Sequence, residues 1–140
     1  MDIKPCTIRD LEDIYNIVGE TVGYSDELFM SLRSSILLGS TCFLHEGRVL
    51  IYESVGKGKY NVHIHSSKSS ARGKSLRNFA VKTGRWMLDN KSAKAFINFV
   101  PEDRLDIKLF MKMIGSVCMG KIPNTNEFVY VSHPNPDIRE

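Results

Sequence analysis

A basic segment that contains a glycine is the part of the sequence best suited to chemistry. It ends in Arg72, Gly73 and Lys74, and the pattern that follows predicts the start of a helix. Backbone N–H groups at a helix N-terminus, with cationic side chains beside them, form a natural site for phosphate. We therefore expect a phosphate-bearing ligand where a strand over residues 60–65 gives way to this segment.

Two histidines alternate with apolar residues on that strand. His63 and His65 share one face, and Val62 and Ile64 share the other, because successive side chains of a strand point to opposite sides. A zinc site needs a third or fourth ligand, and the sequence offers none at a suitable spacing, so we predict no metal. The remaining interpretations are two polar surface residues, or one histidine beside a substrate.

Positive charge is concentrated around the glycine segment and the helix after it. Between Ser67 and Lys94 the only acidic residue is Asp89. The basic residues of this stretch are Lys68, Arg72, Lys74, Arg77, Lys82, Arg85, Lys91 and Lys94. Such a run is either a solvated helix face or a surface for phosphate or another polyanion. The stretch lacks interleaved exposed aromatic residues for base stacking, which argues against nucleic acid as the partner.

Bulk properties narrow the class of protein. A chain of 140 residues is expected to fold as a single domain over residues 1–140. Its apolar runs are shorter than the roughly 20 residues that span a bilayer, and Met1–Pro5 does not resemble a signal peptide. The three cysteines share no metal-ligand spacing and are interpreted as small buried residues in a reducing compartment, which predicts the cytoplasm.

The elements that must position these residues follow from hydrophobic periodicity. Thr7 and Asp10 form a capping-box-like pattern at the first helix. Helices are predicted over residues 8–22, 26–37, 75–89 and 103–114. Strands are predicted over residues 3–6, 41–44, 49–52, 60–65, 95–100, 117–122 and 128–131. The result is a mixed α/β sheet with helices on both faces, in which strands 60–65 and 95–100 are parallel because a helix joins them.

This order of elements resembles the GNAT superfamily of acetyl-CoA-dependent N-acetyltransferases. The segment 3–11 resembles the first strand and helix start of that family, and 72–77 resembles its pyrophosphate loop, Gln/Arg-x-x-Gly-x-Gly/Ala. The segment 104–116 resembles its last helix, Asn-x-x-Ala-x-x-Leu-Tyr-x-x-x-Gly-Phe. The resemblance implies a GNAT-like, mostly antiparallel sheet flanked by helices on both faces, with one central parallel strand pair.

The resemblance also implies which residues contact the cofactor, acetyl-CoA. They are Arg72, Gly73, Lys74, Ser75, Arg77 and Arg104. The family uses a general base to deprotonate the amine, and His65 is the best candidate here, because the unperturbed pKa of histidine lies near neutrality. A tyrosine of the last helix often protonates the leaving thiolate in this family. Met111 stands at that position and is equally well interpreted as a core residue.

Several residues depart from the family pattern. Ser75 and Arg77 replace small residues of the loop, Arg104 replaces the asparagine, and Met111 replaces the tyrosine. Glycine lets the backbone approach a phosphate closely, so larger side chains there indicate a degenerate acetyl-CoA site, although an arginine can instead pair with the phosphate.

The sequence also resembles the divergent GNAT-like proteins of tailed bacteriophages. The resemblance is carried by Gly73-Lys74 and by Ile114-Gly115-Ser116. It implies a virion component or an assembly and interaction protein with protein partners and no cofactor, in the host cytoplasm or in the virion. The alternative is a working N-acetyltransferase that uses acetyl-CoA and acts on an amine. The sequence leaves open whether the protein is an enzyme.

Overall fold

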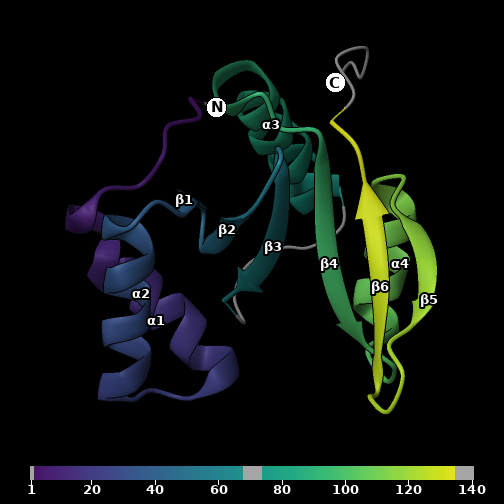
Figure 1. The fold of residues 1–140 in the computed structure, drawn as a ribbon. Coiled ribbons are helices and arrows are strands. Elements are labelled where there is room, and N and C mark those ends of the chain that lie inside the picture. The colour runs from purple at the N-terminus through teal and green to yellow at the C-terminus, as the bar shows by residue number, and fades with distance from the viewer. Residues whose placement is uncertain (1, 68–73, 135–140) are drawn as a thin grey trace. The chain divides into compact units, whose positions relative to one another are not determined.

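The computed structural model describes residues 2–67 and 74–134 (Figure 1). In this part of the chain the helices are α1 (Leu11–Val22), α2 (Asp26–Leu37), α3 (Lys74–Lys91) and α4 (Leu105–Met113), and a 3-10 turn, Ile8–Asp10, precedes α1. The strands are β1 (Thr41–His45), β2 (Arg48–Gly56), β3 (Lys59–Ser66), β4 (Ala95–Pro101), β5 (Val117–Lys121) and β6 (Glu127–Ser132). No described helix is both long enough and apolar enough to cross a membrane.

The strands form one six-stranded sheet in the order β1-β2-β3-β4-β6-β5. Strands β3 and β4 are parallel, with a register from Lys59 opposite Ala95 to Asn61 opposite Ile97. The pairs β1–β2, β4–β6 and β5–β6 are antiparallel. The predicted fold class is therefore confirmed: the sheet is mixed and mostly antiparallel, flanked by helices, with one parallel pair at its centre.

The chain divides into two compact units. The first unit comprises Met1–Ser54 and Val62–Ala71, and the second comprises Val55–Asn61 and Arg72–Glu140. Each unit is described below by itself. The candidate residue His65 belongs to the first unit, and helices α3 and α4 belong to the second.

Two tight turns set the register of the hairpins. Glu46 and Gly47 connect β1 to β2, and both have positive φ angles, 49° and 76°. Lys57 and Gly58 connect β2 to β3 with φ angles of 57° and 76°. Two consecutive residues of positive φ define the type I′ turn, which matches the twist of antiparallel strands and favours glycine at its second position.

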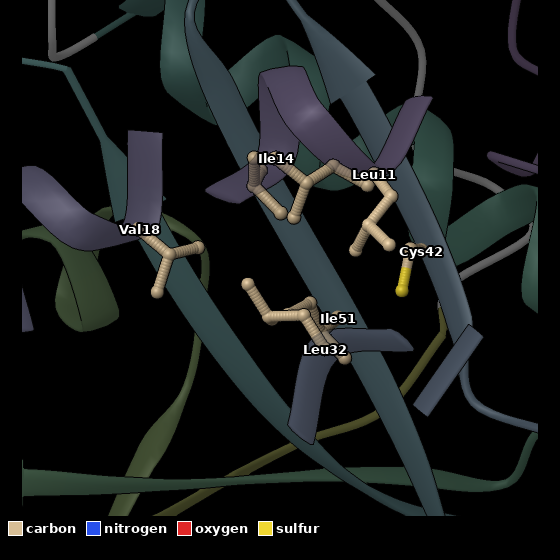
Figure 2. Packing of buried hydrophobic residues seen from close by; sticks show 7 residues of the cluster. Leu11, Ile14, Val18, Leu32, Cys42 and Ile51 are labelled. Carbon is tan, nitrogen blue, oxygen red and sulfur yellow. The ribbon is translucent and has the colours of Figure 1, made fainter. Parts of the chain in front are cut away.

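The core of the first unit is built on one face of α1 (Figure 2). Leu11, Ile14 and Val18 recur at helical spacing and point toward Leu32 of α2 and toward Cys42 and Ile51 of the sheet. All of these side chains are buried. Burial of a large aliphatic side chain stabilises the folded state by about 1.5–3 kcal/mol, so this cluster is what fixes α1 against its strands.

Hydrogen bonds by side chains fix the start of α1. The Thr7 N–H donates to Asp10 Oδ2 at 2.8 Å, and the Arg9 N–H donates to Thr7 Oγ1 at 3.3 Å. The predicted capping box is therefore confirmed. The predicted strand over residues 3–6 is wrong, since this segment has no regular secondary structure. Pro5 lacks an N–H donor and restricts the residue before it, and one bond, from Cys6 N–H to Cys42 O at 2.7 Å, ties the segment to β1.

The second unit contains the amphipathic helix α4 and the edge strand of the sheet, β5. Phe110 and Met111 of α4 are buried, at 7% and 0% exposure. Figure 1 shows α4 beside β5 and β6. Strand β5 is exposed along its whole length and ends the sheet. Its ladder with β6 is interrupted between Cys118 and Gly120, and Gly120 has a φ of 118°, so β5 carries a bulge.

Candidate functional site

His65 lies on β3 of the first unit and is held by the end of α1. Its Nδ1 atom is 3.2 Å from the hydroxyl oxygen of Thr21, and that hydroxyl donates to the Val18 carbonyl at 3.0 Å. A hydroxyl has a single proton to donate. With that proton directed to the Val18 carbonyl, we assign the Nδ1–H of His65 as the donor to Thr21. This arrangement leaves Nε2 as the nitrogen that carries the free lone pair of a neutral imidazole.

The surroundings of His65 favour its neutral form. Burial is the larger cause and repulsion from His63 the smaller, and together they lower the pKa of His65 from 6.5 to about 4. Loss of hydration disfavours the charged form of a histidine. The imidazole is therefore neutral at pH 7. Among the described residues, Thr21 is the hydrogen-bond partner of its ring.

Next to it, His63 faces a carboxylate. Its Nε2 lies 3.9 Å from Glu53 Oε1 on β2, and both side chains are about half exposed, at 49% and 53%. The strand therefore presents one accessible histidine beside an acid and one desolvated histidine on the same face. An arrangement of this kind can attract a cationic group and can accept a proton from it.

Glu53 and Thr21 are the two members of this site that were not predicted from the sequence. The sequence does carry a signal for Glu53, because it follows the buried run of β2 at the point where that strand becomes exposed. Thr21 carries no such signal. It lies 44 residues from His65 along the chain, and only the folded structure brings the two together.

The predicted phosphate site falls partly outside the described residues. Arg72 and Gly73 lie outside them, and Lys74 is described only as the first residue of α3. Ser75 and Arg77 are partly buried in the first turn. The Arg77 side chain makes no hydrogen bond or ion pair with any described residue. The first turn contains no acidic residue, so nothing in it offsets the positive end of the helix dipole.

Arg104, the remaining predicted cofactor contact, forms an ion pair with a neighbour in the chain, Asp106. It sits at the N-cap of α4, and its Nε and Nη2 donate to the two carboxylate oxygens of Asp106, each at 3.1 Å. These hydrogen bonds are the largest cause that raises the pKa of Arg104. The pair is nearly half exposed, at 46% and 47%, so solvent screens it and it can open at low cost. A role for Arg104 in binding cofactor stays a prediction.

The position that resembles the catalytic tyrosine of the family is a core position. Met111 has no exposed surface, and its thioether has no proton to give. Its interpretation as a core residue is confirmed. As for metals, no group of three His, Cys, Asp or Glu side chains among the described residues could hold an ion.

Comparison with known proteins gives a fold. No protein-family model and no curated protein matches the sequence. A GNAT-family acetyltransferase from Bacillus cereus ATCC 10987 matches the structure with a TM-score of 0.76 and 15% identity, over 96% of this chain and 97% of that one. A ribosomal-protein-S5-alanine acetyltransferase from Vibrio fischeri matches with a TM-score of 0.70 and 10% identity, over 96% and 93%.

A third match was solved with ligands. It is the spermidine N-acetyltransferase from Vibrio cholerae in complex with CoA and spermine, with a TM-score of 0.74 and 9% identity over 95% of each chain. At such low identities the matches establish the fold alone. The protein therefore has the GNAT acetyltransferase fold, which confirms that part of the resemblance found in the sequence. The likeness to bacteriophage proteins stays a prediction.

Proposed function

We propose that this protein is an acetyl-CoA-dependent N-acetyltransferase in which His65 accepts the proton of the amine. The observation that carries the proposal is the state of His65: desolvated, neutral at pH 7, and bonded through Nδ1 to Thr21 so that Nε2 is available. The fold supports it, because each of the matched structures described above is an acetyltransferase. The solved complex with CoA and spermine supports an amine as the acceptor.

The chemistry required of the chain is modest. Acetyl-CoA supplies an acetyl group already activated as a thioester. The amine nitrogen forms the new bond to the acetyl carbon, the carbon–sulfur bond breaks, and the amine proton passes to His65 Nε2. With a pKa of about 4, His65 is a weak base. It therefore accepts the proton as the new bond forms and the nitrogen becomes acidic, or from an amine that is itself desolvated.

The departing sulfur needs a proton as well. Met111 is buried and has none to give, so in this proposal the proton comes from water. Loss of a tyrosine at this position lowers the rate but does not prevent the reaction, since a thiolate is a stable leaving group whose protonation is not required for bond cleavage.

The cofactor phosphates would be held at the start of α3. In this proposal Arg72, Gly73, Lys74, Ser75 and Arg77 supply backbone N–H groups and cations. Two observations support this assignment: the Arg77 guanidinium has no partner among the described residues, and the first turn lacks an acid. Arg104 would join them only after it releases Asp106.

Calorimetry with acetyl-CoA tests the proposal. We expect binding in the micromolar range by the unaltered protein and no binding by the Arg72→Ala/Lys74→Ala variant. Lys91→Ala is the matched control, because Lys91 is an exposed lysine at the other end of the same helix, and it should bind normally. No heat at millimolar acetyl-CoA from a folded protein would contradict the proposal.

Turnover tests the role of His65 separately. With a panel of polyamines as acceptors, His65→Gln should leave the affinity for acetyl-CoA unchanged and lower kcat by roughly a hundredfold or more, the usual effect of losing a general base. His133→Gln serves as control, because His133 is an exposed histidine that contacts the Lys94 carbonyl in the second unit. An unchanged kcat in His65→Gln would remove His65 from the mechanism.

A second candidate is the GNAT-fold interaction protein of a bacteriophage, in the host cytoplasm or in the virion. Two observations favour it: Met111, at the position of the family's tyrosine, is buried in the core, and Arg104, a predicted cofactor contact, is paired with Asp106. In that case the acetyl-CoA site is degenerate and the partners are proteins. A folded protein without acetyl-CoA binding in the calorimetric experiment would favour this candidate.

A further inference from the structure

A cavity of about 520 Å³ opens between α4 and the β5–β6 hairpin of the second unit. It is lined by Leu105, Lys108, Leu109, Lys112, Ser116, Cys118 and Tyr130. None of these residues is part of the candidate acetyltransferase site. The volume lies within the range of roughly 300–1,000 Å³ that is typical of small-molecule sites.

One part of the lining is apolar without being part of the core. Leu105 and Leu109 are one helical turn apart on α4, and each is 67% exposed. The opposite side of the same helix buries Phe110 and Met111. Helix α4 thus has two apolar sides, and only one of them is buried in the core. Exposed apolar side chains that gather at a cavity are typical of a binding site.

The other part of the lining is positively charged. Lys108 Nζ donates to the Glu102 carbonyl at 2.7 Å and lies 4.6 Å from the centre of the Phe128 ring. Both partners are uncharged groups, so they orient the ammonium without neutralising it. Lys112 is exposed, and its side chain makes no hydrogen bond or ion pair with any described residue.

The nearby acids have cationic partners of their own. Asp106 is bonded to Arg104, and the Glu102 carboxylate lies 3.6 Å from Lys121 Nζ. The two lysines therefore leave the cavity with a positive charge that a bound anion would offset.

Hydrogen-bond donors complete the lining. The Tyr130 side chain is hydrogen-bonded to Cys118. Loss of hydration is the larger cause that raises the pKa of the phenol and Cys118 the smaller, so the phenol stays protonated. Ser116 Oγ is buried and has no hydrogen-bond partner among the described residues. A buried hydroxyl without a partner is unfavourable, and an acceptor brought into the cavity would relieve it.

We propose that this cavity binds a small amphipathic anion. Its apolar body would lie on Leu105 and Leu109, and its carboxylate or phosphate group would lie against Lys112, within reach of the oriented ammonium of Lys108. The argument rests on charge complementarity beside an exposed apolar surface, and it is independent of whether acetyl-CoA binds elsewhere.

Cys118 provides a built-in reporter of occupancy. It is exposed and lines the cavity. The other two thiols are in the first unit, where burial raises the pKa of Cys6 to about 12 and that of Cys42 to about 11. A thiol reacts as its thiolate, so iodoacetamide at pH 8 should alkylate Cys118 and spare the other two. Mass spectrometry of the intact protein and of its peptides measures the rate and the position.

The experiment compares three probes with the same eight-carbon chain. Octanoate should slow alkylation of Cys118 by roughly tenfold at about nine times its Kd, where about 90% of the protein is occupied. Octanol should protect only at roughly tenfold higher concentration, because it lacks the charge-assisted hydrogen bond, and octylamine should not protect. Octyl phosphate should protect at least as well as octanoate, which separates a general anion site from one that is specific for carboxylates.

Two substitutions locate the site. Lys112→Glu should weaken protection by octanoate by roughly tenfold or more, measured as the ratio of rates with and without ligand in the same variant. Lys91→Glu is the matched control, because Lys91 is also an exposed lysine in the last turn of its helix, and it should behave as the unaltered protein. Leu109→Ser changes an exposed position and should weaken protection by both octanoate and octanol.

Three results would overturn the proposal. Equal protection by octanol and octanoate would mean that the charge plays no part. Equal weakening by Lys91→Glu and Lys112→Glu would place the anion elsewhere. Protection that grows with protein concentration in the absence of any probe, together with a dimer in analytical ultracentrifugation, would show that a second copy of the chain covers the cavity instead.

Discussion

Helices α1 and α4 use their apolar residues differently. The apolar stripe of α1, Leu11, Ile14 and Val18, is buried, and these residues contact α2 and the strands (Figure 2). Helix α4 buries Phe110 and Met111 but exposes three further apolar residues. These are Leu105, Leu109 and Met113. The difference shows that an apolar residue at helical spacing is not always buried by the fold. The sequence pattern alone does not tell whether the core covers that side chain or leaves it for a ligand.

The two regions also differ in how they hold polar groups. At the end of α1, Thr21 fixes a desolvated histidine through a single hydrogen bond. Around α4 the polar groups are the exposed pair of Arg104 with Asp106 and the two lysines of the cavity. A group that is held away from water has a shifted pKa, whereas an exposed ion pair is screened and contributes little to stability.

The largest expected difference between the two helices is in the loss of stability when one apolar residue of each is truncated. Ile14→Ala should lower the free energy of unfolding by about 2–5 kcal/mol, because it leaves a cavity in a closed core. Leu109→Ala should change it by less than about 0.5 kcal/mol, because Leu109 already contacts water. Urea denaturation followed by circular dichroism measures both. A cost for Leu109→Ala that equals that of Ile14→Ala would mean that α4 is covered in solution.

The next effect is a pH dependence that belongs to the α1 region. The folded-state pKa of His65 is about 4 and its ordinary value is 6.5, so between these values the unfolded chain binds the additional proton. Stability should therefore fall as the pH drops from about 6.5 to about 4, by on the order of 3 kcal/mol when complete. Denaturation at a series of pH values measures this loss, and His65→Gln should remove it. An equal loss in His65→Gln would assign the effect to other groups.

The smallest effect compares the two helix starts. Thr7→Ala removes the capping hydroxyl before α1 and should cost about 1 kcal/mol. Arg104→Ala removes an exposed ion pair before α4 and should cost less than about 0.5 kcal/mol, because Arg104 provides no side-chain cap. Urea midpoints of the two variants provide the test. If Arg104→Ala is as costly as Thr7→Ala, the guanidinium makes a stabilising contact beyond Asp106.

Local chemistry explains why most of the fold could be predicted from the sequence. The helix predicted over residues 8–22 and the capping box at Thr7 depend on residues within one or two helical turns, and both are confirmed. The turn at Glu46 and Gly47 depends on two adjacent residues. The error at residues 3–6 has a local cause too, since Pro5 interrupts the pattern that its apolar neighbours suggest.

The candidate site could be predicted only in part. His65 was identified from its residue type and its place on a strand, but its low pKa depends on burial and on a contact with Thr21, which the sequence does not display. The pairing of Arg104 with Asp106 was also missed, although the two are only two residues apart. The cavity beside α4 could not be predicted, because the sequence does not show which leucines of a helix are buried and which are exposed.

The bulge in β5 has a consequence for the behaviour of the protein at high concentration. A strand at the end of a sheet offers unpaired N–H and C=O groups, on which a neighbouring molecule can build further strands. Strand β5 ends the sheet and carries the exposed residues Val117 and Met119. The break between Cys118 and Gly120 twists this short strand and disturbs its ladder. The irregularity thereby protects an apolar edge from growing into an aggregate.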